Sequence, residues 1–174
     1  PNEEDTESAE TTASVEKVVG ALNVASEKFR KRCPEGFGGL SELIEKKPFL
    51  SKESAGVIAY ALCGCLSGSQ QNALRATALM HMKTFTTVFS VPPAALRKVF
   101  TTLITVIDEC NAQGDAERML AMANSTLLSL EESHPAEVLQ MLLGVCRDIA
   151  GPQTNIQDNN SAEKLLTAAL HGLG

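Results

Sequence analysis

The feature that most constrains this fold is a pairing of amphipathic helical segments at nearly constant spacing. Helix pairs are expected to begin near residue 52, at Pro93 and at Pro135, so their starts lie 41 and 42 residues apart. A repeat of this length is typical of stacked helical hairpins, each of which buries its apolar face against the next. We therefore expect an all-α fold, a short α-solenoid of about three antiparallel hairpins over 52–90, 93–132 and 135–172, preceded by N-terminal helices. An irregular helical bundle is the alternative.

Apolar residues recur at three- and four-residue steps within each expected helix. The spacing predicts N-terminal helices over 14–32 and 40–47, with Ser14 as the first N-cap and the Gly36–Gly39 stretch as a turn between them. Ser51 and Asp115 are expected N-caps, Gly114 is an expected helix end, and Pro93 suits the first turn of a helix. A final helix is expected from Ser161.

The composition agrees with helix-on-helix packing. Apolar residues make up 44% of the chain but aromatic residues only 4%, and Trp is absent, so the core must be mostly aliphatic. No apolar run approaches the roughly 18–20 residues that cross a bilayer. We therefore expect no membrane span.

The negative charge is concentrated at the start of the chain. The formal net charge is −6, and the first ten residues contain no Lys or Arg but five acidic side chains, Glu3, Glu4, Asp5, Glu7 and Glu10. We expect residues 1–13 to form an acidic flexible tail and residues 14–174 a single all-helical repeat domain. The remainder is nearly neutral and lacks the surplus of cations that nucleic-acid binding needs. The chain starts at Pro1, without Met, and we expect a processed N-terminus.

One basic cluster stands out, formed by Lys28, Arg30, Lys31 and Arg32. We expect it in the last turn of the helix before Pro34, where cations oppose the negative end of the helix dipole. A docking patch for an acidic partner is the alternative.

Five cysteines, without the spacing of a disulfide framework, indicate a reducing or organellar interior. Cys63 and Cys65 are two residues apart, so on a helix their thiols point to different sides, and we expect buried structural cysteines rather than a metal or redox pair. Cys110 and Cys146 fall on apolar stripes and are expected in the core.

The remaining polar candidates give no catalytic constellation. His81 is expected to be a satisfied core or groove residue, His134 to lie at a helix start and His171 near a fraying end. Asp108 and Glu109 diverge on a helix and are expected on a solvated face. The Met119–Met122 run is expected between hairpins in the core, with a docking surface as the alternative. We expect no catalytic, cofactor-binding or metal-binding residue, and the sequence leaves the partner-binding residues open.

The central hairpin resembles a pentatricopeptide repeat. The residues that carry the resemblance are Phe100, Leu103, Ile104, Cys110, Gly114, Glu117 and Leu120. The flanking hairpins are weaker copies. Met119 departs from the small residue that the family places at the helix crossing, the repeats are longer than the family's period, and its Gly-x-x-Pro-Asp loop is missing.

In RNA-reading members of the family, a polar residue near the start of the first helix contacts a base, and Thr101 occupies that place here. Val138 and its neighbours give no such reader in the last repeat, so we expect RNA binding to be degenerate or lost. The chain is similar in size and pattern to the small accessory subunits of this type on the euglenozoan mitochondrial F1-ATPase. That resemblance implies a non-catalytic subunit in the mitochondrial matrix, within the inner-membrane-associated ATP synthase, on the outside of the F1 head against the alpha subunit. An organellar RNA-binding protein is the alternative.

Overall fold

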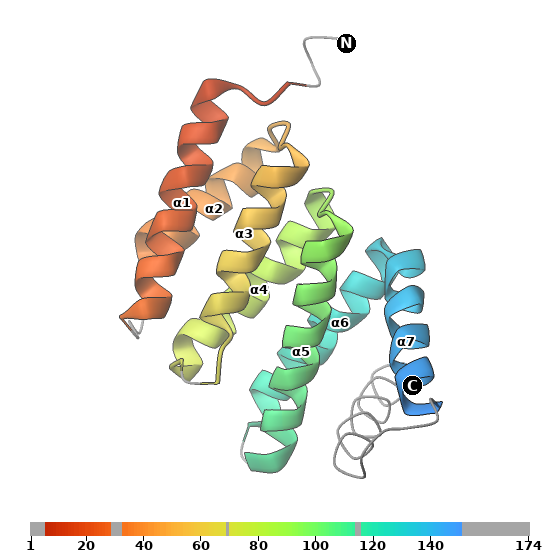
Figure 1. Cartoon of the computed structure of the whole chain (residues 1–174). Helices are drawn as coiled ribbons and strands as arrows, with labels where there is room; N and C mark the ends of the chain where they lie inside the picture. Colours follow the sequence, from red (N-terminus) through yellow and green to blue (C-terminus); the bar gives the residue numbers. More distant parts are fainter. Residues whose placement is uncertain (1–5, 29–32, 69, 114–115, 151–174) are drawn as a thin grey trace.

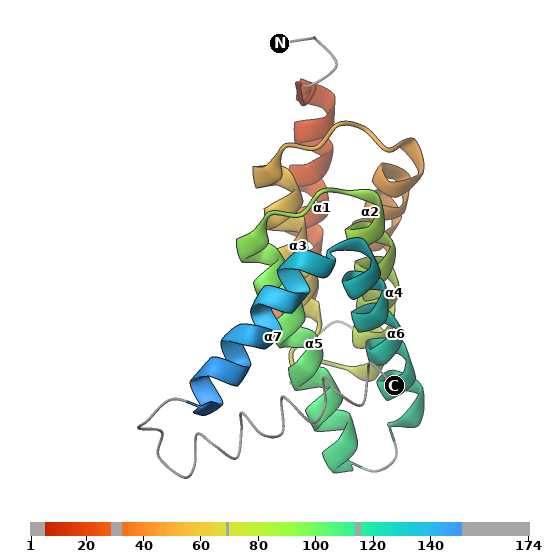
Figure 2. The ribbon, with the colours of Figure 1, turned by 90° about the vertical axis from the view of Figure 1, so that its right-hand side faces the viewer.

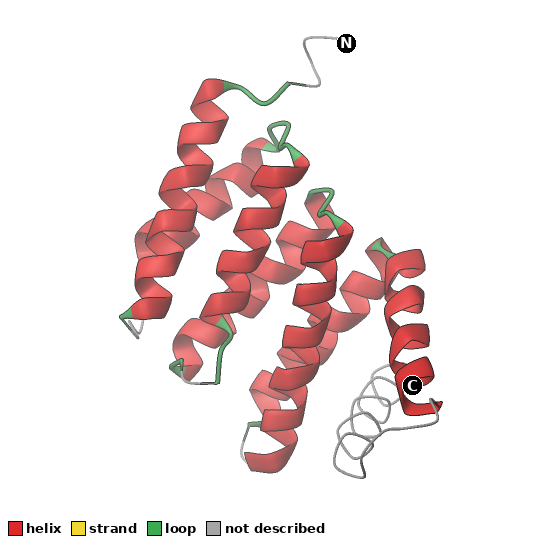
Figure 3. Cartoon of the chain, viewed as in Figure 1, coloured by secondary structure: helices red, strands yellow, loops and turns green. Residues whose placement is uncertain are grey.

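The computed structural model describes residues 6–28, 33–68, 70–113 and 116–150, with their side chains except at 113 and 145–150. Within these ranges the chain forms seven α-helices and no strand (Figure 3). They are α1 (Ala9–Glu27), α2 (Pro34–Lys46), α3 (Lys52–Cys65), α4 (Asn72–Val88), α5 (Pro93–Gln113), α6 (Glu117–Ser133) and α7 (Pro135–Ala150). The expected all-α class is confirmed.

The helices pack in two layers. In the first, which we call the odd layer, α1 contacts α3, α3 contacts α5, and α5 contacts α7; in the even layer, α2 contacts α4 and α4 contacts α6. The pairs α1–α2, α3–α4 and α5–α6 connect the layers as hairpins that stand side by side (Figure 1). A view turned by 90° places the two layers on opposite sides of the molecule (Figure 2). This arrangement is a short α-solenoid.

The repeat extends further toward the N-terminus than expected. Odd-layer helices begin at Ala9, Lys52, Pro93 and Pro135, so the spacings are 43, 41 and 42 residues. The helices α1 and α2 are therefore a hairpin of the array rather than a separate N-terminal element. Of the expected hairpin over 135–172, α7 is described, whereas the helix expected from Ser161 lies outside the described residues.

Hydrogen bonds across the even layer show the same register. Lys83 Nζ of α4 donates to Ser125 Oγ of α6 at 2.8 Å, and the Thr87 and Ser129 hydroxyls are 3.1 Å apart. Both pairs join residues 42 positions apart. Equivalent positions of successive repeats therefore lie beside one another on parallel helices.

The core between the layers is aliphatic, as the composition predicts. Its fully buried side chains come from every helix from α1 to α6, and include Leu22, Leu40, Leu62, Leu79, Leu103 and Leu130. Burying each such side chain stabilises the fold by about 1.5–3 kcal/mol. No helix within the described ranges combines the length and the apolar character that a bilayer crossing requires.

The expected tail boundary is wrong, because α1 starts at Ala9 and not at Ser14. Ser8 is the N-cap, and its Oγ accepts a hydrogen bond from the Thr11 N–H at 3.1 Å. Ser14 lies inside the helix and donates to the Glu10 carbonyl. Glu7, just before the helix, accepts hydrogen bonds from the Ser51 N–H and the Ser54 hydroxyl, each at 2.8 Å. The segment from residue 6 is therefore part of the fold, while 1–5 lie outside the described residues.

The end of α1 and the start of α2 also differ from the prediction. The first helix ends at Glu27 with Lys28 as its C-cap, so the basic cluster is not in its last turn, and Arg30, Lys31 and Arg32 lie outside the described residues. Pro34 is the first residue of α2, and the glycines after it are helical rather than a turn. A left-handed C-cap, Lys47 at φ 46°, ends α2.

Other boundary signals are confirmed. Ser51 caps α3, since its Oγ accepts from the Ser54 N–H at 3.1 Å, and Pro93 and Pro135 begin α5 and α7. The expected signals at Gly114 and Asp115 lie outside the described residues.

Candidate protein-interaction surface

The paired cysteines of α3 face different neighbours, as their spacing predicts. Cys65 is fully buried, and its Sγ donates to the Leu22 carbonyl of α1 at 3.6 Å. Cys63 is also buried, and its neighbours are on α5. The Thr102 side chain forms a hydrogen bond with its thiol, and the positive charge of Lys98 acts on it electrostatically. Cys33 is also buried, and its Sγ donates to the Ala21 carbonyl at 3.1 Å. These thiols fill space between helices, and those of Cys33 and Cys65 also donate to backbone carbonyls.

Burial also suppresses the reactivity of the thiols of Cys63, Cys65 and Cys110. It raises the pKa of Cys65 to about 12, with further contributions from Cys33 and Cys63. Burial raises the pKa of Cys63 too, against the lowering effect of Thr102 and Lys98, and it raises the pKa of Cys110. Because the thiolate is the reactive and metal-binding form, such thiols are poor nucleophiles and ligands near neutral pH. The core location expected for Cys110 is confirmed, whereas the side chain of Cys146 lies outside the described residues.

Two histidines connect neighbouring repeats. His81 on α4 contacts the Thr77 carbonyl through Nδ1 at 2.9 Å and the Ser41 Oγ of α2 through Nε2 at 3.1 Å, and its ring lies 4.8 Å from that of Phe37. It is the satisfied groove residue that we expected. His134, at the junction of α6 and α7, contacts the Thr86 carbonyl through Nε2 at 3.0 Å. His171 lies outside the described residues.

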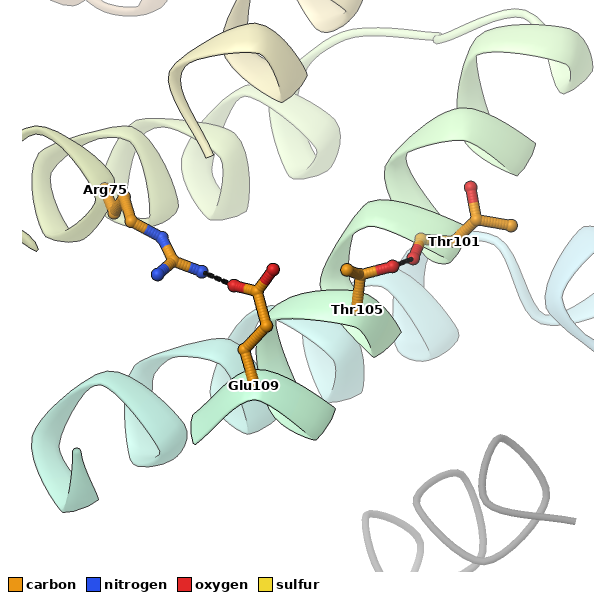
Figure 4. Close-up of polar contacts among 4 residues, drawn as sticks. All are labelled: Arg75, Thr101, Thr105 and Glu109. Atoms are coloured by element: carbon orange, nitrogen blue, oxygen red, sulfur yellow. Dashed lines mark hydrogen bonds and ion pairs between the residues drawn. The ribbon is translucent and has the colours of Figure 1, made fainter. Parts of the chain in front are cut away.

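The candidate base-reading residue does not join a polar site. Thr101 is exposed on α5, and its hydroxyl donates to the Arg97 and Lys98 carbonyls of its own helix at 3.0 and 3.1 Å. One turn later, the Thr105 hydroxyl donates to the Thr101 carbonyl at 2.9 Å (Figure 4). The hydroxyl groups of Thr101 and Thr105 thus donate to backbone carbonyls of their own helix.

The same face of α5 ends in an ion pair that the sequence did not predict. Arg75 on α4 is 4% exposed, and its guanidinium binds the Glu109 carboxylate, which is 31% exposed (Figure 4). Of the two adjacent acidic residues, Asp108 is exposed as expected, but the solvated face predicted for Glu109 is wrong. Arg75 lies 34 residues away in the sequence, so no local pattern identifies this pair.

The surface of the even layer is hollowed between neighbouring helices. Between α4 and α6, two neighbouring hollows of about 350 and 440 Å³ share Arg118 and Met122. Met119 is buried, as expected for a core position, but Met122 is only partly buried and lines both hollows. The core position expected for this run therefore holds for Met119, whereas Met122 is packed against the core but partly exposed.

Large apolar side chains remain exposed on several helices. Met80 of α4 is 59% exposed, and Leu139 and Leu143 of α7 are 57% and 54% exposed. The other exposed large apolar residues are Phe49, Val57, Tyr60 and Leu128. Within the described ranges, no group of three or more His, Cys, Asp or Glu side chains could hold a metal ion. The described surface therefore offers apolar side chains for contact.

Together these features define a class of protein, a short α-solenoid of stacked helical hairpins with exposed apolar positions on both layers. No protein-family model, curated protein or solved structure matches this chain.

Proposed function

We propose that this chain is a non-catalytic accessory subunit of mitochondrial ATP synthase, docked on the outside of the F1 head against the alpha subunit. The observation that carries the proposal is the solenoid itself. Its core is formed by buried aliphatic side chains, while large apolar residues such as Met80 and Leu139 stay exposed. Burial of such exposed apolar side chains against a partner protein would be favourable. The resemblance of the central hairpin to a pentatricopeptide repeat supplies the choice of partner.

The chemistry of the described residues supports a binding role over an enzymatic one. Burial raises the pKa of the described thiols at Cys63, Cys65 and Cys110. Thr101, the one candidate for base reading, uses its hydroxyl within its own helix. The raised thiol pKa values favour a binding role over nucleophilic catalysis, and the hydrogen bond of Thr101 favours a protein partner over RNA.

Native purification of the assembly from mitochondria, followed by mass spectrometry, tests the proposal. We expect this chain to co-purify with the alpha and beta subunits in a fixed ratio. Recovery of the chain without these subunits would contradict the proposal. Tight, sequence-selective binding of single-stranded RNA at physiological salt would instead support the alternative, an organellar RNA-binding protein.

A further inference from the structure

The groove between α4 and α6 has an apolar floor built from equivalent positions of two repeats. Met80 and Met122 are 42 residues apart, the same offset as the hydrogen-bonded pairs Lys83–Ser125 and Thr87–Ser129. The two methionines therefore occupy the same register on parallel neighbouring helices, and both line the smaller hollow. Methionine side chains are flexible and polarizable, which suits a surface that adapts to a partner.

Two cations without a counter-charge among the described residues flank this floor. Lys83 and Arg118 line the smaller hollow, and its described lining includes no acidic side chain. The Lys83 ammonium donates to the neutral Ser125 hydroxyl, and Arg118 makes no ion pair or hydrogen bond with a described residue. Glu45 of α2 lies with Met80 and Lys83 in the next hollow but forms no ion pair with Lys83. This groove is thus locally positive on a chain whose net charge is −6.

We propose that the α4–α6 groove binds an amphipathic segment of the partner protein that places an apolar side chain on Met80 and Met122 and carboxylates beside Lys83 and Arg118. This inference rests on the proposed function, because it assigns the docking surface of that interaction. Helical segments commonly bind grooves through one apolar face, and complementary charges at the rim set the orientation and speed association. Carboxylates would give both cations the counter-charge that the described residues do not supply.

A nucleic acid fits this groove less well. Two cations release few phosphate counterions, and the nearly neutral remainder of the chain adds no surplus of cations. The floor offers methionine thioethers and not the aromatic faces on which unpaired bases stack.

Charge reversal in the full-length chain tests the groove against the assembled F1 head. The variant combines Lys83→Glu with Arg118→Glu, and the control combines Lys17→Glu with Arg97→Glu, two exposed cations of the odd layer. Because like charges would then oppose the partner's carboxylates, we expect the groove variant to bind about tenfold more weakly or worse, and the control to bind like the original chain. Circular dichroism and thermal unfolding confirm that both variants fold. Equal binding by both variants would overturn the groove proposal, whereas failure of the original chain to bind F1 would overturn the proposed function.

A second measurement tests the binding proposed for the groove without using F1. The chain has five methionines, and ¹³C labelling of their methyl groups gives one NMR signal for each. The probe is a short helical peptide with a leucine stripe flanked by glutamates, and a lysine-flanked version is the control. We expect the acidic peptide to shift Met80 and Met122 while leaving buried Met82 and the α7 residue Met141 unchanged. No shift, an equal response to the lysine peptide, or a stronger response to a single-stranded RNA oligonucleotide would overturn the proposal.

Discussion

Glu7 shows how a single residue can connect two elements. It precedes α1, yet its carboxylate accepts hydrogen bonds from the Ser51 N–H and the Ser54 hydroxyl at the start of α3. A carboxylate at a helix N-terminus satisfies donors that the helix leaves free and interacts favourably with the dipole. Partial burial raises the pKa of Glu7, but the hydrogen bonds from Ser51 and Ser54 outweigh this effect, so the net pKa is lowered from 4.5.

This lowered pKa predicts a stability change with a definite sign. Because the pKa of Glu7 is lower in the folded state, its contribution is present above the unfolded pKa of 4.5 and is lost as the pH falls through the folded value. We expect Glu7→Gln to lower the Tm at neutral pH, and the difference from the original chain to shrink below pH 4.5. Thermal unfolding monitored by circular dichroism across this pH range measures the effect. Glu16→Gln, at an exposed position of α1, is the control and should give a difference that does not change with pH in this way; an equal trend for both variants would contradict the assignment.

The Arg75–Glu109 pair gives a second prediction for single residues. Glu109→Gln removes the counter-charge of a guanidinium that is 4% exposed, and we expect a loss of about 1–3 kcal/mol in the free energy of unfolding. Adding Arg75→Met should recover part of that loss, since the buried charge is then absent. The free energies of unfolding in urea of the original chain, the two single variants and the double variant form a double-mutant cycle. Additive effects would show that the pair contributes no interaction energy.

At the scale of the helices, sequence patterns predicted some boundaries and missed others. Apolar periodicity identified the helices of the two central hairpins, and Ser51, Pro93 and Pro135 marked the starts of α3, α5 and α7 as predicted. The same rules failed at α2, where glycines after a proline were interpreted as a turn. Gly36 is helical because α1 packs against it: an added Cβ would lie 2.9 Å from Cys33 Sγ and 3.1 Å from Leu22 Cδ2. Close packing between helices, which no local pattern encodes, favours glycine there.

The glycines of α2 supply a matched pair for testing this explanation. Gly36→Ala should lower the free energy of unfolding by about 1–3 kcal/mol, because the methyl group overpacks the contact with Leu22 and Cys33. Gly38 lies on the exposed side of the same helix with open space around its missing Cβ, so Gly38→Ala should raise stability by about 0.5–1 kcal/mol through helix propensity. Urea unfolding measures both variants. Equal effects of the same sign would mean that propensity and not the α1–α2 contact explains Gly36.

At the scale of the molecule, the sequence predicted the repeat but not its surface. The 41- and 42-residue spacings gave the hairpins, and the structure adds α1 and α2 as a further one. The α4–α6 groove was harder to foresee because Met80, Lys83 and Arg118 come together only when two repeats align. The one signal available was the 42-residue offset between Met80 and Met122, which has meaning only once the register of the even layer is known.

A solenoid differs from a bundle in how far a local loss of stability extends along the chain. In this chain, α1 and α2 contact α3 and α4 but not α5 or α6, so each hairpin depends on its neighbours alone. Stability is then the sum of local terms and can be lost at one end first. In a bundle with a shared core, unfolding would be all-or-none over the whole chain.

Truncation of one buried leucine at each end distinguishes these cases. Leu22 of α1 and Leu130 of α6 are fully buried, so Leu22→Ala and Leu130→Ala should each cost about 2–5 kcal/mol. In a solenoid, Leu22→Ala should accelerate amide hydrogen exchange mainly in α1 to α3, and Leu130→Ala mainly in α5 to α7. Hydrogen exchange with mass spectrometry resolves these segments. If each variant instead lost protection uniformly from α1 to α7, the hairpins would form one cooperative unit, and the nearest-neighbour description of this array would be wrong.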